Sequence, residues 1–150
     1  MKGGIIMLNS SVQYPPVTYQ SLFCRFLYKY DSLRNFRSAE SFERVKNGFI
    51  AQVDQIIGSK NKMLLHRTLA ELKDFNKTFV KGEVIYLSGN AKIELDLIRH
   101  LRNSIAHGLL RLSGKFFIIE DYNDHSRRNL SAYGKIKTTK IKDLLENYIN

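Results

Sequence analysis

Hydrophobic residues recur every three or four positions along most of the chain up to residue 112, and this spacing is typical of helices that pack on a shared core. The first predicted helix follows Pro15-Pro16, and capping residues or glycines bound the later ones. The pattern predicts four helices, at residues 17–30, from the N-cap Ser38 to Gly58, at residues 62–80, and from the capping residue Asn90 to Leu112.

After Gly114 the helical spacing gives way to runs of β-branched and aromatic residues. The stretches KFFIIED (residues 115–121) and SAYGKIKT (residues 131–138) predict two strands, and the turn-rich YNDHSRRN between them predicts a hairpin. Thr138 or Thr139 is then expected to cap a last short helix, KIKDLLENYI.

These elements predict a mainly α fold, a helical bundle with a small β-hairpin and a short C-terminal helix. The length and the 43% hydrophobic content suit one domain over residues 1–150, in which residues 1–16 form a loose N-terminal arm. The segment EVIYL, residues 83–87, is assigned neither to a helix nor to a strand by this pattern.

The chain is strongly basic, with a net charge of +10, and its lysines and arginines gather in residues 60–81, 127–128 and 135–142. These charges fit RNA binding, and they fit an ordinary solvated surface equally well. The single cysteine, Cys24, excludes an intramolecular disulfide, and its aromatic neighbours predict that it is a small buried hydrophobe. Without a signal peptide or an apolar run of about 20 residues, the chain is expected to be cytoplasmic.

The fourth predicted helix carries two stripes when its residues are placed at about 100° intervals. The apolar stripe, expected to face the core, contains Leu97, Ile98, Leu101, Ile105, Leu109 and Leu112. The opposite, polar stripe contains Asp96, His100, Asn103, His107 and Arg111, with Arg99 and Arg102 on its flank. Exposed helix faces normally carry lysine and glutamate in mixed-sign pairs, so this stripe predicts an anionic ligand or a partner surface.

The residue types of the polar stripe suit the cleavage of RNA. Histidine moves protons near neutral pH, arginine stabilises charge on a phosphate, and asparagine hydrogen-bonds an imidazole or a substrate oxygen. The RNA supplies its own nucleophile, the 2′-hydroxyl. The sequence has no P-loop, no dinucleotide fingerprint and no zinc-site spacing among its four histidines, so no cofactor and no metal are expected.

The run from Arg102 to His107, RNSIAH, resembles the signature of the HEPN superfamily. That signature is an arginine, usually followed by a polar residue, with a histidine four to six positions later. The wider LIRHLRNSIAHG, followed by the strand KFFIIED and a terminal helix, is similar to small bacterial and plasmid-borne HEPN proteins. The likeness is detailed over residues 91–150.

The resemblance implies an α-helical protein that forms a two-fold homodimer, with the motifs of both copies in a shared cleft. It also implies a metal-independent endoribonuclease that serves as a toxin or defence effector, with RNA and an antitoxin protein as partners. Toxins paired with a small nucleotidyltransferase carry a tyrosine two residues after the histidine, where this chain has Leu109. The candidate catalytic residues are Arg102, His107 and Asn103, and the candidate RNA contacts are Arg99, His100 and Arg111.

The spacing within the motif is also informative about assembly. Arg102 and His107 are five residues apart and project about 140° from each other around a straight helix. Two antiparallel copies of the helix would place both pairs around one groove. Other interpretations stay open: a non-catalytic HEPN module that binds RNA or a nucleotide or scaffolds a complex, a basic DNA-binding protein, or an Arg102 that only pairs with an acid.

Overall fold

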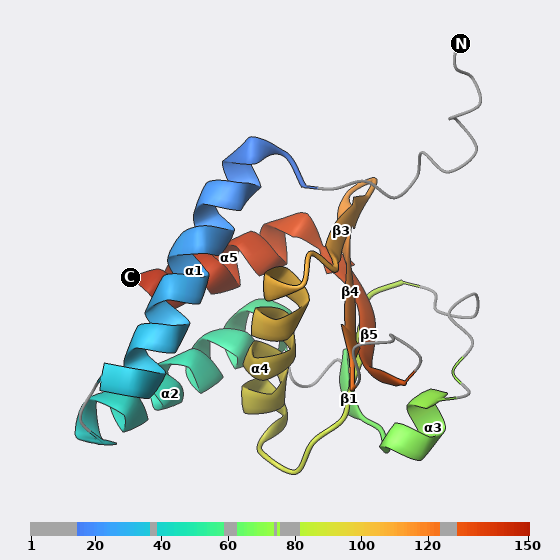
Figure 1. Ribbon diagram of the computed structural model, residues 1–150, viewed down its shortest axis with the longest axis horizontal. Helices are drawn as coiled ribbons and strands as arrows, with labels where there is room; N and C mark the ends of the chain where they lie inside the picture. The colour runs from blue at the N-terminus through green and yellow to red at the C-terminus, as the bar shows by residue number, and fades with distance from the viewer. Residues whose placement is uncertain (1–14, 37–38, 59–62, 74, 76–81, 124–128) are drawn as a thin grey trace.

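The computed structural model describes residues 15–36, 39–58, 63–73, 75, 82–123 and 129–150. A layer of helices covers one face of a β-sheet, and a short helix lies against the opposite face (Figure 1). Most of the expected N-terminal arm, the N-cap Ser38 and the centre of the hairpin turn lie outside the described residues.

Among the described residues the sheet has five strands, in the order β1-β2-β5-β4-β3. Strands β1 and β2 are parallel, and the other neighbouring pairs are antiparallel. The strands are β1 (Leu64–His66), β2 (Val84–Leu87), β3 (Leu110–Ser113), β4 (Phe116–Tyr122) and β5 (Leu130–Lys137). The prediction of a mainly α bundle with a small hairpin is therefore wrong, because the predicted hairpin, β4 and β5, is extended on both sides by further strands.

The helical layer contains the elements with the clearest periodicity. It consists of α1 (Val17–Phe36), α2 (Ala39–Val53) with a π-helical turn at Asp54–Gly58, α4 (Ile93–Ala106) and α5 (Thr138–Ile149). The Tyr148 ring makes edge-to-face contacts with Phe26 and Phe49 within this layer, and the core that they join extends to Phe117 of the sheet. Cys24 is exposed on α1, which corrects its predicted burial. None of the described helices is long and apolar enough to cross a membrane.

The helix predicted at residues 62–80 is not continuous in the described part of that segment. Leu64–His66 form β1, and only Leu69–Lys73 are helical, as the short helix α3. The Thr68 hydroxyl accepts from the Glu71 backbone N–H, and the Glu71 carboxylate accepts from the Thr68 N–H and hydroxyl. The Thr68 N–H bond holds the pKa of Glu71 below its usual value. This reciprocal capping box starts a new helix at Leu69.

Helix α4 ends at Ala106, well before the predicted end at Leu112. Gly108 adopts the left-handed conformation, with a φ of 69°. The Leu109 N–H donates to the Ser104 carbonyl at 2.7 Å, and the Gly108 N–H donates to Ile105 at 3.1 Å. This is a Schellman motif, which satisfies the last carbonyls and turns the chain into β3.

The segment EVIYL forms β2, and the residue that begins it also caps the last helix. Both oxygens of Glu83 accept hydrogen bonds at the start of α5, from the Lys137 backbone N–H at 2.9 Å and from Lys140 Nζ at 2.8 Å. Lys137 occupies the N-cap position, and no side chain of α5 itself caps the helix. The prediction that Thr138 or Thr139 caps α5 is wrong, because a carboxylate distant in sequence takes that role.

Candidate functional site

The polar stripe of α4 does not face solvent along its whole length. The apolar side of the helix is buried as predicted at Leu97, Ile98 and Leu101. On the polar side, Asp96 is 2% exposed and His100 is 0% exposed, because the sheet covers them. The first part of the stripe is therefore an internal contact between helix and sheet.

His100 connects α4 to two strands through both ring nitrogens. Its Nδ1 lies 2.8 Å from Asp121 Oδ2 of β4, and its Nε2 lies 2.7 Å from the Ser88 carbonyl after β2. Arg99 Nη2 also lies 3.2 Å from His100 Nε2, so both ring nitrogens have partners within the protein. His100, predicted to contact RNA, thus has an enclosed side chain whose two ring nitrogens are directed to protein groups.

Asp96 holds a second histidine that the sequence pattern does not single out. Asp96 Oδ2 lies 2.7 Å from Nε2 of His66, the last residue of β1. Arg99 Nη2 donates to the other Asp96 oxygen at 3.3 Å and to the Ser88 carbonyl at 2.9 Å. These bonds hold the side chains of His66 and Arg99 while leaving each of them more than two-fifths exposed.

The motif residues at the end of α4 have looser surroundings. Arg102 lies beside Asp31 of α1, with two nitrogen–oxygen distances of 3.4 Å, and the two side chains are 32% and 45% exposed. Asn103 Nδ2 donates to Asp121 Oδ2 at 3.1 Å, and its oxygen lies 3.4 Å from Arg102 Nη1. The motif is therefore tied to the sheet through Asn103 and to α1 through Arg102.

His107 is the residue at which α4 stops. It is exposed and occupies the C-cap position, directly before the left-handed Gly108. No described hydrogen bond joins His107 to Arg102, whose guanidinium lies toward α1. The convergence of Arg102 and His107 on one phosphate stays a prediction.

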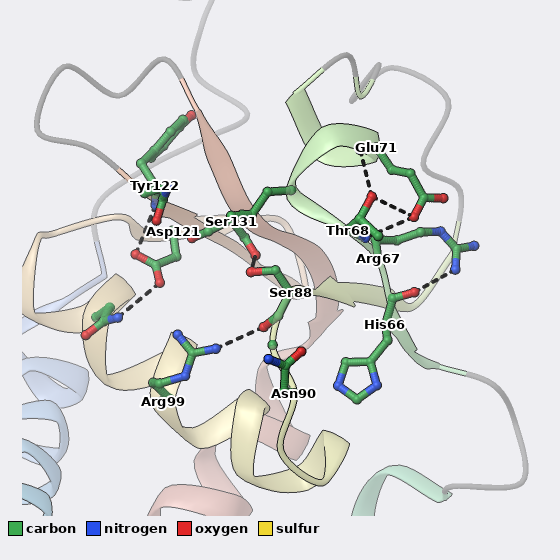
Figure 2. A pocket seen from close by; sticks show the side chains of 14 residues that line it. His66, Arg67, Thr68, Glu71, Ser88, Asn90, Arg99, Asp121, Tyr122 and Ser131 are labelled. Atoms are coloured by element: carbon green, nitrogen blue, oxygen red, sulfur yellow. Dashed lines mark hydrogen bonds between the residues drawn. The ribbon is translucent and has the colours of Figure 1, made fainter.

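A polar cleft of about 640 Å³ lies beside the motif, at the end of the sheet where β1, β2 and β4 finish (Figure 2). Helix α4 contributes Arg99 and Asn103 to its wall, whereas Arg102 and His107 do not line it. The strand ends and the turn into α3 contribute His66, Arg67, Thr68, Leu69, Glu71, Ser88, Gly89, Asn90, Asp121, Tyr122, Asn123 and Ser131.

The remaining candidates from the sequence fall in different places. Arg99 lines the cleft, and Arg111 lies half-buried on β3, opposite Ile118, and not on the helix. His66 and Arg67 were missed because their segment was predicted to be helical. The described residues contain no group of three or more histidine, cysteine or carboxylate side chains that could hold a metal ion.

In a comparison with known protein families, the chain matches one family. The model of the family described as HEPN pEK499 p136 matches residues 17–150, from the first residue of α1 to the end of the chain. No curated protein and no solved structure matches the chain.

Proposed function

The chain belongs to the HEPN pEK499 p136 family, and from this membership we propose that it is a metal-independent endoribonuclease that acts as a toxin or defence effector. One observation carries the proposal. His107 stands exposed at the end of a helix whose preceding polar residues, Asp96 and His100, are buried and bonded to the sheet. The fold thus holds α4 rigidly and leaves the motif histidine accessible.

In the proposed reaction, His107 removes the proton from an RNA 2′-hydroxyl, and the 2′-oxygen attacks the adjacent phosphorus. The 2′-O–P bond forms, the P–O5′ bond breaks, and the 5′-oxygen leaves with a proton from the second imidazole of a dimer. Arg102 stabilises the negative charge that develops on the non-bridging oxygens. The products are a 2′,3′-cyclic phosphate and a 5′-hydroxyl.

A homodimer is part of this proposal because one protomer separates the two side chains. Arg102 lies toward α1, and His107 is exposed at the turn after α4. A two-fold axis near the end of α4 would place Arg102 of one copy near His107 of the other. Asn103, bonded to Asp121 and next to Arg102, is proposed to orient the guanidinium.

A second candidate function is a HEPN module that binds RNA or a nucleotide without cutting it. The Asp31 carboxylate beside Arg102 favours this alternative, because its negative charge opposes the approach of a phosphate to the guanidinium. The two functions differ in whether RNA is fragmented or only retained.

The test uses purified full-length protein and end-labelled RNA in the presence of a strong chelator. We expect cleavage to persist, to fall in mildly acidic solution where imidazoles become protonated, and to give cyclic phosphate ends. His107→Ala should lower the rate by about 100- to 10,000-fold, and Arg102→Ala by about 100- to 1,000-fold. Asn103→Ala should have a smaller effect, because its amide carries no charge.

Controls separate loss of chemistry from loss of structure. Arg25→Ala removes an exposed arginine of α1 and should leave the cleavage rate unchanged. Light scattering should give twice the 17.4 kDa chain mass for the wild type and for each variant. A folded, dimeric His107→Ala that cleaves as fast as the wild type would exclude this mechanism. RNA retention by a wild type that never cleaves would favour the non-catalytic module.

A further inference from the structure

The cleft beside α4 brings together cationic side chains that a ligand can reach. Its cationic side chains are Arg67, Arg99 and, when protonated, His66. Of its two carboxylates, Asp121 is nearly enclosed, whereas Glu71 is exposed and its Oε1 accepts from the Thr68 N–H and hydroxyl. Asp121 accepts from Asn103 and the Tyr122 N–H and pairs with His100.

The cationic groups retain hydrogen-bond donors that the protein does not use. Only Nη2 of Arg99 and only Nη1 of Arg67 have an acceptor among the described residues. His66 uses Nε2 toward Asp96, and no described partner contacts its Nδ1. An arginine has five N–H donors, so each guanidinium can still present a pair of donors to a phosphate.

These side chains are also held in place before any ligand binds. Arg99 is fixed by the Ser88 carbonyl and Asp96, and His66 is fixed by the same carboxylate. The Arg67 guanidinium lies over the Tyr86 ring, 5.1 Å from its centroid. Such prior placement lowers the conformational entropy lost on binding, which is a property of binding sites more than of solvated surfaces.

We propose that this cleft is a second site that binds a phosphate group of a nucleotide through Arg67, Arg99 and His66. Its volume of about 640 Å³ falls within the range of small-molecule pockets. Asn90, which lies between Arg99 and His66 in Figure 2, supplies an amide donor and acceptor for the ribose or the base. The identification of RNA as the natural source rests on the proposed function, whereas phosphate binding does not.

The cleft lies next to the motif, because Asn103 belongs to both. Asn103 lines the cleft and is also within 3.4 Å of Arg102. A nucleotide seated here would therefore lie close to the strand at the motif. The site is formed within one protomer, so it does not depend on the proposed dimer.

Binding is measured by calorimetry in the His107→Ala background, so that no RNA is cut during the titration. Adenosine monophosphate (AMP) should bind at least about tenfold more tightly than adenosine, a difference typical of charge-assisted contacts to a phosphate. Inorganic phosphate should compete with AMP, and the affinity should fall as salt is raised. Arg67→Gln should weaken AMP binding by about tenfold, and His66→Gln by less, with adenosine binding unchanged.

The matched control is Arg25→Gln, which removes an exposed arginine on α1, away from the cleft. It should leave AMP binding unchanged. Arg99→Gln is paired with a melting curve because Arg99 also holds Ser88. If this variant does not fold, Arg67→Gln alone decides the result. Equal affinities for AMP and adenosine, or equal losses in Arg67→Gln and Arg25→Gln, would overturn the proposal.

Two RNA tetramers identify the source of the phosphate. If only a 5′-phosphorylated tetramer competes with AMP, the cleft binds a terminal phosphate. If an unphosphorylated tetramer competes equally well, the cleft binds the backbone. Both outcomes support the site, and neither depends on whether the wild type cleaves RNA. Failure of the ribonuclease proposal is seen separately, in the cleavage assay.

Discussion

The two ends of the polar side of α4 share residue types but have opposite surroundings. At one end, which we call the buried end, Asp96 and His100 are enclosed by the sheet and bonded at 2.7–2.8 Å. At the other, the exposed end, Arg102 makes contacts of 3.4 Å and His107 is open to solvent. Residues on one face of a helix can therefore have different roles. Here the buried end attaches the helix to the sheet, and the exposed end carries the motif.

The largest expected effect is a difference in stability between variants of His100 and variants of His107. His100→Ala leaves a cavity between α4 and the sheet and removes one hydrogen-bond partner each from Asp121 and the Ser88 carbonyl, so it should lower the free energy of unfolding by about 3–5 kcal/mol. His107→Ala removes an exposed side chain and should change that free energy by less than about 0.5 kcal/mol. Urea denaturation followed by circular dichroism measures both.

His100→Gln keeps the comparison measurable if His100→Ala does not fold. A glutamine keeps an NH2 donor group and part of the side-chain volume, so its cost should lie between those of the two alanine variants. Equal losses of stability in the His100 and His107 variants would contradict the division of α4 into a buried and an exposed end.

Glu83 provides an intermediate case, because it is a partly buried carboxylate that joins β2 to α5. Burial raises its pKa, but the Lys140 ammonium and the Lys137 N–H more than offset this and hold the pKa of Glu83 below its usual value. A lowered pKa stabilises the fold above the pKa of the unfolded chain, and this stabilisation disappears as the pH falls through the folded value. Glu83→Gln should therefore lower stability by about 1 kcal/mol at neutral pH.

Measuring the free energy of unfolding over a series of pH values tests the lowered pKa of Glu83. The difference between wild type and Glu83→Gln should shrink as the pH falls below about 4.5, the usual range of a glutamate. The control is Asp143→Asn, which removes an exposed carboxylate of α5. It should have little effect on stability at any pH. A Glu83→Gln difference that grows in acid would contradict the lowered pKa.

The parts of the fold that were predicted correctly depend on local signals. Helices α1 and α2 and the strands β4 and β5 have long periodic or alternating patterns bounded by glycine or turn residues. The short strands β1 and β2 depend on pairing with distant partners, as where Ile85 packs on Gly134 of β5. No pattern within three or four residues reveals such pairing.

Two of the wrong helix boundaries could have been found from neighbouring residues in the sequence. The Thr68–Glu71 capping box lies inside the helix predicted at residues 62–80 and marks a new start there. Gly108 lies inside the predicted fourth helix and marks its end. The motif was found because its spacing is local. Arg67 directly follows β1, and its placement at the cleft depends on a distant partner, the Leu87 carbonyl, which accepts from the Arg67 N–H at 3.0 Å.

The smallest expected effect concerns the ion pair at the exposed end. Arg102 and Asp31 are about a third and nearly half exposed, and their 3.4 Å contacts are long for an ion pair. Such pairs contribute little, because water screens the charges and two long side chains lose conformational freedom. A double-mutant cycle with Arg102→Ala and Asp31→Ala should give a coupling free energy of about 0.5 kcal/mol or less.

The matched cycle at the buried end uses His100→Gln and Asp121→Asn, and its coupling should exceed about 1.5 kcal/mol. Raising the salt to about 1 M should abolish the Arg102–Asp31 coupling and leave the buried coupling largely intact, since only exposed charges are screened. A coupling at Arg102 as large and as salt-resistant as that at His100 would make Arg102 a structural residue. His107 would then be the only motif side chain left in the exposed end. Loss of cleavage in Arg102→Ala would be explained by a change in folding, and no longer by loss of charge stabilisation at the phosphate.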